Sequence, residues 1–184
     1  MSSPQPVSPA PTDDPLRDPD RLAEIVRLDL FSDEMRDMIS DMTTRAAERF
    51  DLPISQISVV LDEAQFNAAQ HGLDGLWIAD AEGHPVEWSF CRHAVRDHAP
   101  FIVEDTTKHE RTKENPLVKQ GYVKCYAGIP LITSRDYVLG SLCVVGPEPR
   151  AFGEDELNDL RAMADEVMRR IEDRAAKMKI NGAA

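Results

Sequence analysis

The sequence predicts an α+β fold in which a sheet carries its helices packed against one face. Two observations support this prediction. Long amphipathic helical patterns stand near both ends of the chain, and short β-type runs alternate with short helical pieces between them. The chain has 184 residues, 42% of them hydrophobic, which suits one globular domain with a tail.

The N-terminal region combines a tail with two helices. Residues 1–20 hold six of the 13 prolines, and such a segment buries too little apolar area to offset its ordering entropy, so we expect disorder. A short helix is expected at about Arg21–Leu28. A longer helix follows Ser32, a suitable N-cap, and Pro53 ends it. Its apolar residues form one buried stripe: Phe31, Met35, Met38, Met42 and Ala46.

The first strands follow directly. Ile54–Leu61 is rich in β-branched residues and is expected to be a strand. Asp62 and Glu63 form a turn, and Gln65–Gln70 returns as the second strand of a hairpin.

Residues 72–86 have the composition of a loop, with a possible helical turn around Leu76–Asp80. Val86–Phe90 is expected to be a short strand and Arg92–His98 a short helix. A further strand is expected at Phe101–Glu104, directly after a proline.

The C-terminal half begins with a polar loop at residues 105–120, with a short helix starting near Thr112. Val123–Leu131 and Tyr137–Val145 are apolar runs joined by a polar turn, which predicts a hairpin. A last helix, expected at residues 154–175, starts after Gly153 with an acidic first turn, and we expect residues 179–184 to fray. Its stripe is spaced three or four residues apart: Leu157, Leu160, Ala164, Val167 and Ile171.

Charge and composition exclude several function classes. The net charge is −12, which repels phosphate backbones and anionic membrane surfaces. No run approaches the ~20 apolar residues of a membrane helix, and the N-terminus has no secretory pattern. We therefore expect a cytoplasmic protein that binds neither nucleic acid nor membranes. The three cysteines do not suggest a disulfide framework.

Six segments, in this order and spacing, resemble the GAF family. They are Ser89–Cys91, Pro100–Asp105, Asn115–Val118, Tyr126–Leu131, Leu139–Val145 and Phe152 before the last helix. The resemblance implies a single domain over residues 21–178, with a central antiparallel sheet and the terminal helices on one face. On the other face, loops and short helices would enclose a small-molecule pocket. GAF domains usually regulate rather than catalyse, and neither ligand nor cofactor can be named from this sequence.

Two cysteines are the redox candidates. Cys91 stands at the start of a predicted helix, where the positive helix end lowers a thiol pKa. The resemblance puts this segment and the strand of Cys125 on one side of the sheet, so the two thiols are expected to form a redox-responsive pair. The alternative is that they are small, buried apolar residues.

The pocket candidates are mostly aromatic. Trp88, Phe90, Tyr122 and Tyr126 fall where the resemblance implies pocket walls, although the same residues would serve equally as core. The further candidates are His93 and Asp105. No metal site is expected, because the nearby cysteine and histidines do not share a helix face.

Three functions remain open. The first is a regulatory module that senses a small molecule or redox state and acts through a homodimer of the terminal helices or through an effector protein. The second is a thiol enzyme resembling the free methionine-(R)-sulfoxide reductases, although the acidic residues that would hold the substrate are missing at Tyr126, Cys143 and Val145. The third is a degenerate GAF domain that serves only for interaction. No catalytic residue is assigned.

Overall fold

A computed structural model describes residues 13–76 and 83–182. Its centre is a six-stranded sheet in the order β3-β2-β1-β6-β5-β4, and every neighbouring pair is antiparallel. The predicted α+β class is therefore confirmed. The strands are β1 (Ile54–Val60), β2 (Ala64–His71), β3 (Gly83–Pro85), β4 (Phe101–Val103), β5 (Cys125–Ile132) and β6 (Val138–Gly146).

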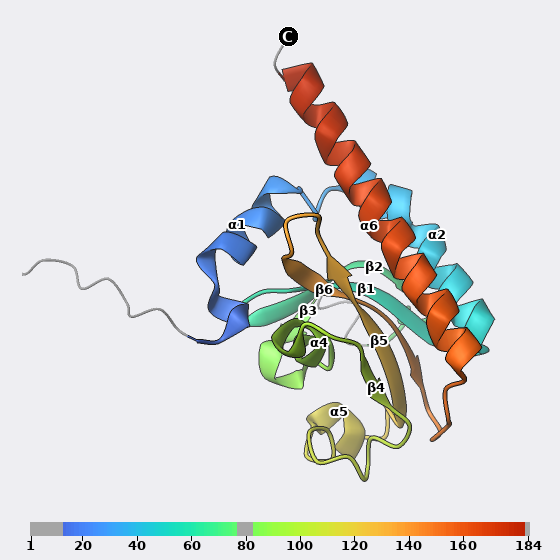
Figure 1. Cartoon of the computed structure of the whole chain (residues 1–184). Helices are drawn as coiled ribbons and strands as arrows, with labels where there is room; N and C mark the ends of the chain where they lie inside the picture. The colour runs from blue at the N-terminus through green and yellow to red at the C-terminus, as the bar shows by residue number, and fades with distance from the viewer. Residues whose placement is uncertain (1–12, 77–82, 183–184) are drawn as a thin grey trace, which may run out of the picture.

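Two long helices, α2 (Asp33–Phe50) and α6 (Glu154–Gly182), lie side by side on one face of the sheet, as Figure 1 shows. Ser32 caps α2, since its side chain accepts a hydrogen bond from the backbone N–H of Met35. The α6 stripe faces this sheet as well, with Val167 fully buried, so it is not free for a partner. The other helices of the described residues are α1 (Pro19–Arg27), α4 (Cys91–Asp97) and α5 (Pro116–Lys119), with 3₁₀ helices η1 (Pro15–Arg17) and η2 (Val86–Trp88).

Both faces of the sheet are covered and buried. Because successive side chains of a strand point to opposite faces, each strand contributes residues to two apolar clusters. One apolar cluster lies under α2 and α6 and includes Leu142 and Val144 of β6. The other lies under η1 and α4 and includes Cys143 and Val145 of the same strand.

The N-terminal tail is ordered further out than expected. From residue 13 the chain is described, and Leu16 is buried in the second cluster, so the expected disorder is wrong for residues 13–20. The buried Arg21 guanidinium donates hydrogen bonds to the carbonyls of Leu16, Val60 and Val138, which ties this segment to the sheet. The buried Leu16 side chain and the Arg21 guanidinium, which donates several hydrogen bonds, thus order this proline-rich stretch. Residues 1–12 lie outside the described residues.

Local differences lie in the segments between the strands. The strand expected at Val86–Phe90 is wrong: the Val86 N–H still donates to the Glu63 carbonyl, but the Ser89 N–H then donates to the Val86 carbonyl and closes the 3₁₀ helix η2. The short β3 before it was not predicted. The helix expected near Thr112 begins at Pro116, where Asn115 accepts a hydrogen bond from the Leu117 N–H and caps it.

At the C-terminus, α6 continues to Gly182 instead of fraying from residue 179, since its last turns consist mainly of good helix formers. Most of the helical turn expected at Leu76–Asp80 lies outside the described residues. Within the described part, no helix is both long enough and apolar enough to cross a bilayer.

Candidate ligand pocket and thiol cluster

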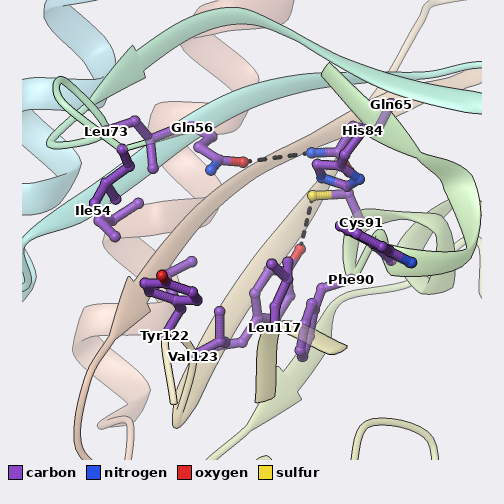
Figure 2. Close-up of a pocket in the computed structure, with 14 residues that line it drawn as sticks. Ile54, Gln56, Gln65, Leu73, His84, Phe90, Cys91, Leu117, Tyr122 and Val123 are labelled. Atoms are coloured by element: carbon purple, nitrogen blue, oxygen red, sulfur yellow. Dashed lines mark hydrogen bonds between the residues drawn. The ribbon is translucent and has the colours of Figure 1, made fainter. Parts of the chain in front are cut away.

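A cavity of about 60 Å³ lies on the sheet face opposite α2 and α6. Its lining residues come from strands β1, β2, β3, β5 and β6 and from the segments around α4 and α5, and Figure 2 shows them as sticks. Most of its lining is apolar or aromatic: Ile54, Leu73, Leu76, Trp88, Phe90, Leu117, Tyr122, Val123, Tyr126 and Val145. The four aromatic residues singled out in the sequence therefore all reach this wall.

Three uncharged polar side chains also line the cavity. The Gln65 amide nitrogen lies 3.5 Å from the Gln56 carbonyl oxygen, and Ser89 donates a hydrogen bond to the Gln65 carbonyl oxygen. His84 lies beside them, and burial lowers the pKa of its imidazole, so the ring is neutral at pH 7. Among the described lining residues none is Asp, Glu, Lys or Arg.

Cys91 contributes a thiol to the same cavity. It is the first residue of α4, and Ser89 caps this helix by accepting from the Arg92 N–H at 2.9 Å. Its Sγ lies 4.0 Å from Sγ of Cys143 in β6, and the Tyr126 hydroxyl donates to it at 3.2 Å (Figure 2). Two thiols and a phenol thus meet in the buried second cluster.

The two thiols have opposite electrostatic tendencies. Burial by itself raises the pKa of the Cys91 thiol, but the surrounding hydrogen-bonding groups, Cys143 first among them, favour the thiolate more strongly and lower its pKa to about 6. The pKa of Cys143 is raised, because its hydrogen bond to Cys91 and its burial hold the proton on its sulfur. Of the two thiols, Cys91 therefore has the stronger tendency to be a thiolate.

Tyr126 reaches Cys91 because its side chain lies over Gly128, two residues along the same strand face. A Cβ atom at Gly128 would approach the Tyr126 hydroxyl to 2.3 Å, closer than any real contact. The phenol also lies 3.2 Å from the Ser141 hydroxyl. The missing side chain at residue 128 thus makes room for the phenol that holds Cys91.

Cys125 does not belong to this cluster, and its expected pairing with Cys91 is wrong. Cys125 and Tyr126 are neighbours in β5, so they point to opposite faces. Cys125 is buried in the cluster under α2 and α6, whereas Cys91 is buried across the sheet. All three cysteines are free thiols.

His93 and Asp105 are not among the lining residues. The His93 ring packs on Phe101 with centroids 4.6 Å apart, and its Nδ1 lies 2.9 Å from an Arg111 nitrogen. Burial and the Arg111 charge lower the pKa of His93 to about 3. Asp105 accepts hydrogen bonds from Thr107 and so stabilises a turn. Within residues 13–76 and 83–182, no group of three His, Cys, Asp or Glu side chains is arranged to hold a metal ion.

Sequence reasoning missed the polar side of the cavity. In β1 it used only the apolar alternation of Ile57 and Val59, which face α2 and α6. Gln56, directly before Ile57, faces the cavity, and a glutamine within an otherwise buried strand was the available signal. Cys143 was not among the redox candidates, and its partner Cys91 lies 52 residues away in sequence, so no local pattern could reveal the pair.

An antiparallel sheet with two long helices on one face and a cavity on the other is the architecture of a class of regulatory sensory domains. A family model described as "GAF domain" matches residues 34–171, and the chain belongs to the GAF family.

Among proteins of known name, a cyclic di-GMP phosphodiesterase of Pseudomonas aeruginosa is 33% identical over 153 residues, which are 82% of this chain and 25% of that protein. The chain thus spans a quarter of the length of this relative.

Two solved structures illustrate the fold. The blue-light absorbing form of the PixJ GAF domain from Thermosynechococcus elongatus has a TM-score of 0.65 and 15% identity, over 89% of this chain and 94% of that one. The type II free methionine-R-sulfoxide reductase of Thermoplasma acidophilum has a TM-score of 0.59 and 13% identity, over 75% and 92%. At these identities the likeness concerns the fold alone.

Proposed function

We propose that this GAF domain is a regulatory module that binds a small, uncharged, planar ligand in the cavity. The observation that carries the proposal is the chemistry of the described lining: aromatic and aliphatic walls with Gln56, Gln65 and the neutral His84 on one side. Aromatic walls suit a flat ligand, and a few convergent polar groups orient it. An ionic ligand would lose its hydration without gaining a counter-charge from these residues.

The same chemistry weighs against two other ligands. The relative from Pseudomonas aeruginosa is named for cyclic di-GMP, but the described lining offers no cation for phosphate groups. Free methionine sulfoxide is a zwitterion, and the described lining offers no carboxylate for its ammonium group, which disfavours a reductase of that kind. A degenerate domain with a filled pocket is disfavoured by the cavity itself.

In this proposal, the helices on the opposite face transmit the effect of ligand binding to a partner. The core stripes of α2 and α6 are occupied by the sheet, but Met178 and Ile180 near the end of α6 are exposed. This end of α6 projects beyond the sheet (Figure 1). We propose that it joins a second copy of the chain, so that changes at the cavity reach a partner through α6.

The test uses defined probes on the purified protein: indole and benzimidazole as uncharged planar ligands, with methionine sulfoxide and cyclic di-GMP as ionic ones. Isothermal titration should detect the first two only. Ile54→Trp should fill the half-buried mouth of the cavity and abolish binding, whereas Leu157→Trp, a half-buried position on the opposite face, should not. Binding of an ionic probe alone, or binding unaffected by Ile54→Trp, would contradict the proposal.

A further inference from the structure

The cavity wall contains two thiols within reach of each other. Cys91 comes from the first turn of α4 and Cys143 from the central strand β6, and their Sγ atoms are 4.0 Å apart. A disulfide needs about 2.05 Å, so closure requires a shift of about 2 Å. Helix α4 packs directly against β6, and Cys91 lies at its end, where small movements are least restricted.

The two thiols differ in access. Both side chains are buried, with Cys91 2% and Cys143 1% exposed, but Cys91 lines the cavity and Cys143 is not among the lining residues. A small oxidant that enters the cavity therefore meets Cys91 first. The Tyr126 hydroxyl donates to Cys91 Sγ at 3.2 Å and stabilises negative charge on that sulfur.

We infer that Cys91 and Cys143 form a peroxide-reactive dithiol site in which Cys91 reacts first and Cys143 resolves the product. The Cys91 thiolate attacks one oxygen of hydrogen peroxide, the O–O bond breaks and hydroxide leaves, so that Cys91 becomes a sulfenic acid. The Cys143 sulfur then attacks the Cys91 sulfur, the S–S bond forms and the S–O bond breaks. The leaving hydroxyl takes the Cys143 proton and departs as water.

The balance is one dithiol and one hydrogen peroxide giving one disulfide and two waters. Two electrons pass from the sulfurs to the peroxide, and an external dithiol reverses the oxidation. Closure displaces Cys91 from its contact with Tyr126, and so alters the wall of the cavity. This site needs the cavity as an access route but needs no bound ligand, so it stands or falls separately from the proposed ligand binding.

The test starts with the full chain and no substitution. Equimolar hydrogen peroxide at pH 7 should remove two hydrogens by intact mass, and peptide mapping should join Cys91 to Cys143. Dithiothreitol should restore both thiols. Cys125→Ser is the matched control, because it removes the buried thiol on the other face and should oxidise like the wild type.

Two further variants separate the roles. Cys143→Ser should leave Cys91 as a sulfenic acid that dimedone traps, and Cys91→Ser should slow oxidation of Cys143 at least tenfold. Circular dichroism checks that each variant is folded. A bridge that includes Cys125, over-oxidation of wild-type Cys91 without a bridge, or thiols that react only after unfolding would overturn the inference.

Discussion

The hydroxyl group of Tyr126 donates a hydrogen bond of 3.2 Å to Sγ of Cys91 and so joins the sheet to the first turn of α4. The Tyr126 ring packs between Phe90 and Phe101, with centroids at 5.1 and 5.9 Å, which fixes the direction of its hydroxyl. A residue of the sheet thereby contributes, together with Cys143, Ser141 and Ser58, to the stabilisation of a thiolate in the cavity wall.

Tyr126→Phe tests this contribution with the ring retained. The variant loses one of several groups that favour the thiolate, so the pKa of Cys91 should rise from about 6 and its alkylation by iodoacetamide at pH 6 should slow by about twofold. In the wild type the rate should climb between pH 5 and 7 and then level off. The measurement is the alkylation rate of Cys91 against pH by mass spectrometry. Superimposable profiles for the two proteins would contradict this role.

Gly128→Ala tests the space that the phenol needs. The new Cβ would meet the Tyr126 hydroxyl at 2.3 Å, so the ring must move, at a cost of about 1–3 kcal/mol in the free energy of unfolding. The pKa of Cys91 should rise together with this loss. Gly153→Ala is the control, because its Cβ would meet its nearest atom at an ordinary 3.6 Å. Urea unfolding measures both, and equal stability of the two variants would count against the packing described.

Leu16→Ala tests the ordered N-terminal segment. Leu16 is 1% exposed, so its truncation should lower the free energy of unfolding by about 2–5 kcal/mol. Val26→Ala, at a side chain that is 79% exposed, should change it by less than about 0.5 kcal/mol. If urea midpoints show Leu16→Ala to be as mild as Val26→Ala, the segment does not dock in solution.

The fold could be predicted where hydrophobic periodicity is long. Met35, Met42 and Ala46 on α2, and the Leu160–Ile171 stripe on α6, are buried as their spacing indicated. Phe31, expected in the first stripe, precedes α2 and is 49% exposed, so that part of the prediction is wrong. Hydrophobic periodicity does not predict the structure of a segment that is held in place by only one or two residues. Leu16 and Arg21 order the tail through contacts with β1 and β6, far along the chain, which no local pattern contains.

The site could be predicted only in part, because alternation was applied to apolar residues alone. The four aromatic residues reach the cavity, but Cys125 was assigned to the same side as Tyr126, although adjacent strand residues face opposite ways. The alternation of the strand was enough to place Cys125 correctly. The approach of Cys91 to Cys143 could not be predicted from the sequence, since it depends on where α4 packs on the sheet.

Self-association through α6 is testable at its exposed end. Ile180 is 72% exposed and Met178 48%, and a dimer would bury them. The wild type should be dimeric at micromolar concentration by light scattering, and the double variant Met178→Glu with Ile180→Glu should be monomeric with unchanged unfolding. A monomeric wild type would refute this route of output.

Protection of Cys91 by a cavity ligand tests the central claim most directly, because Cys91 is both a wall residue and a chemical reporter. The rate of Cys91 alkylation by iodoacetamide is measured at pH 7 with and without saturating benzimidazole. The alkylation rate of the buried Cys125 is the internal control for unfolding. The account predicts that benzimidazole slows Cys91 at least tenfold and leaves the slow reaction of Cys125 unchanged. Binding of benzimidazole with no protection of Cys91 would contradict it.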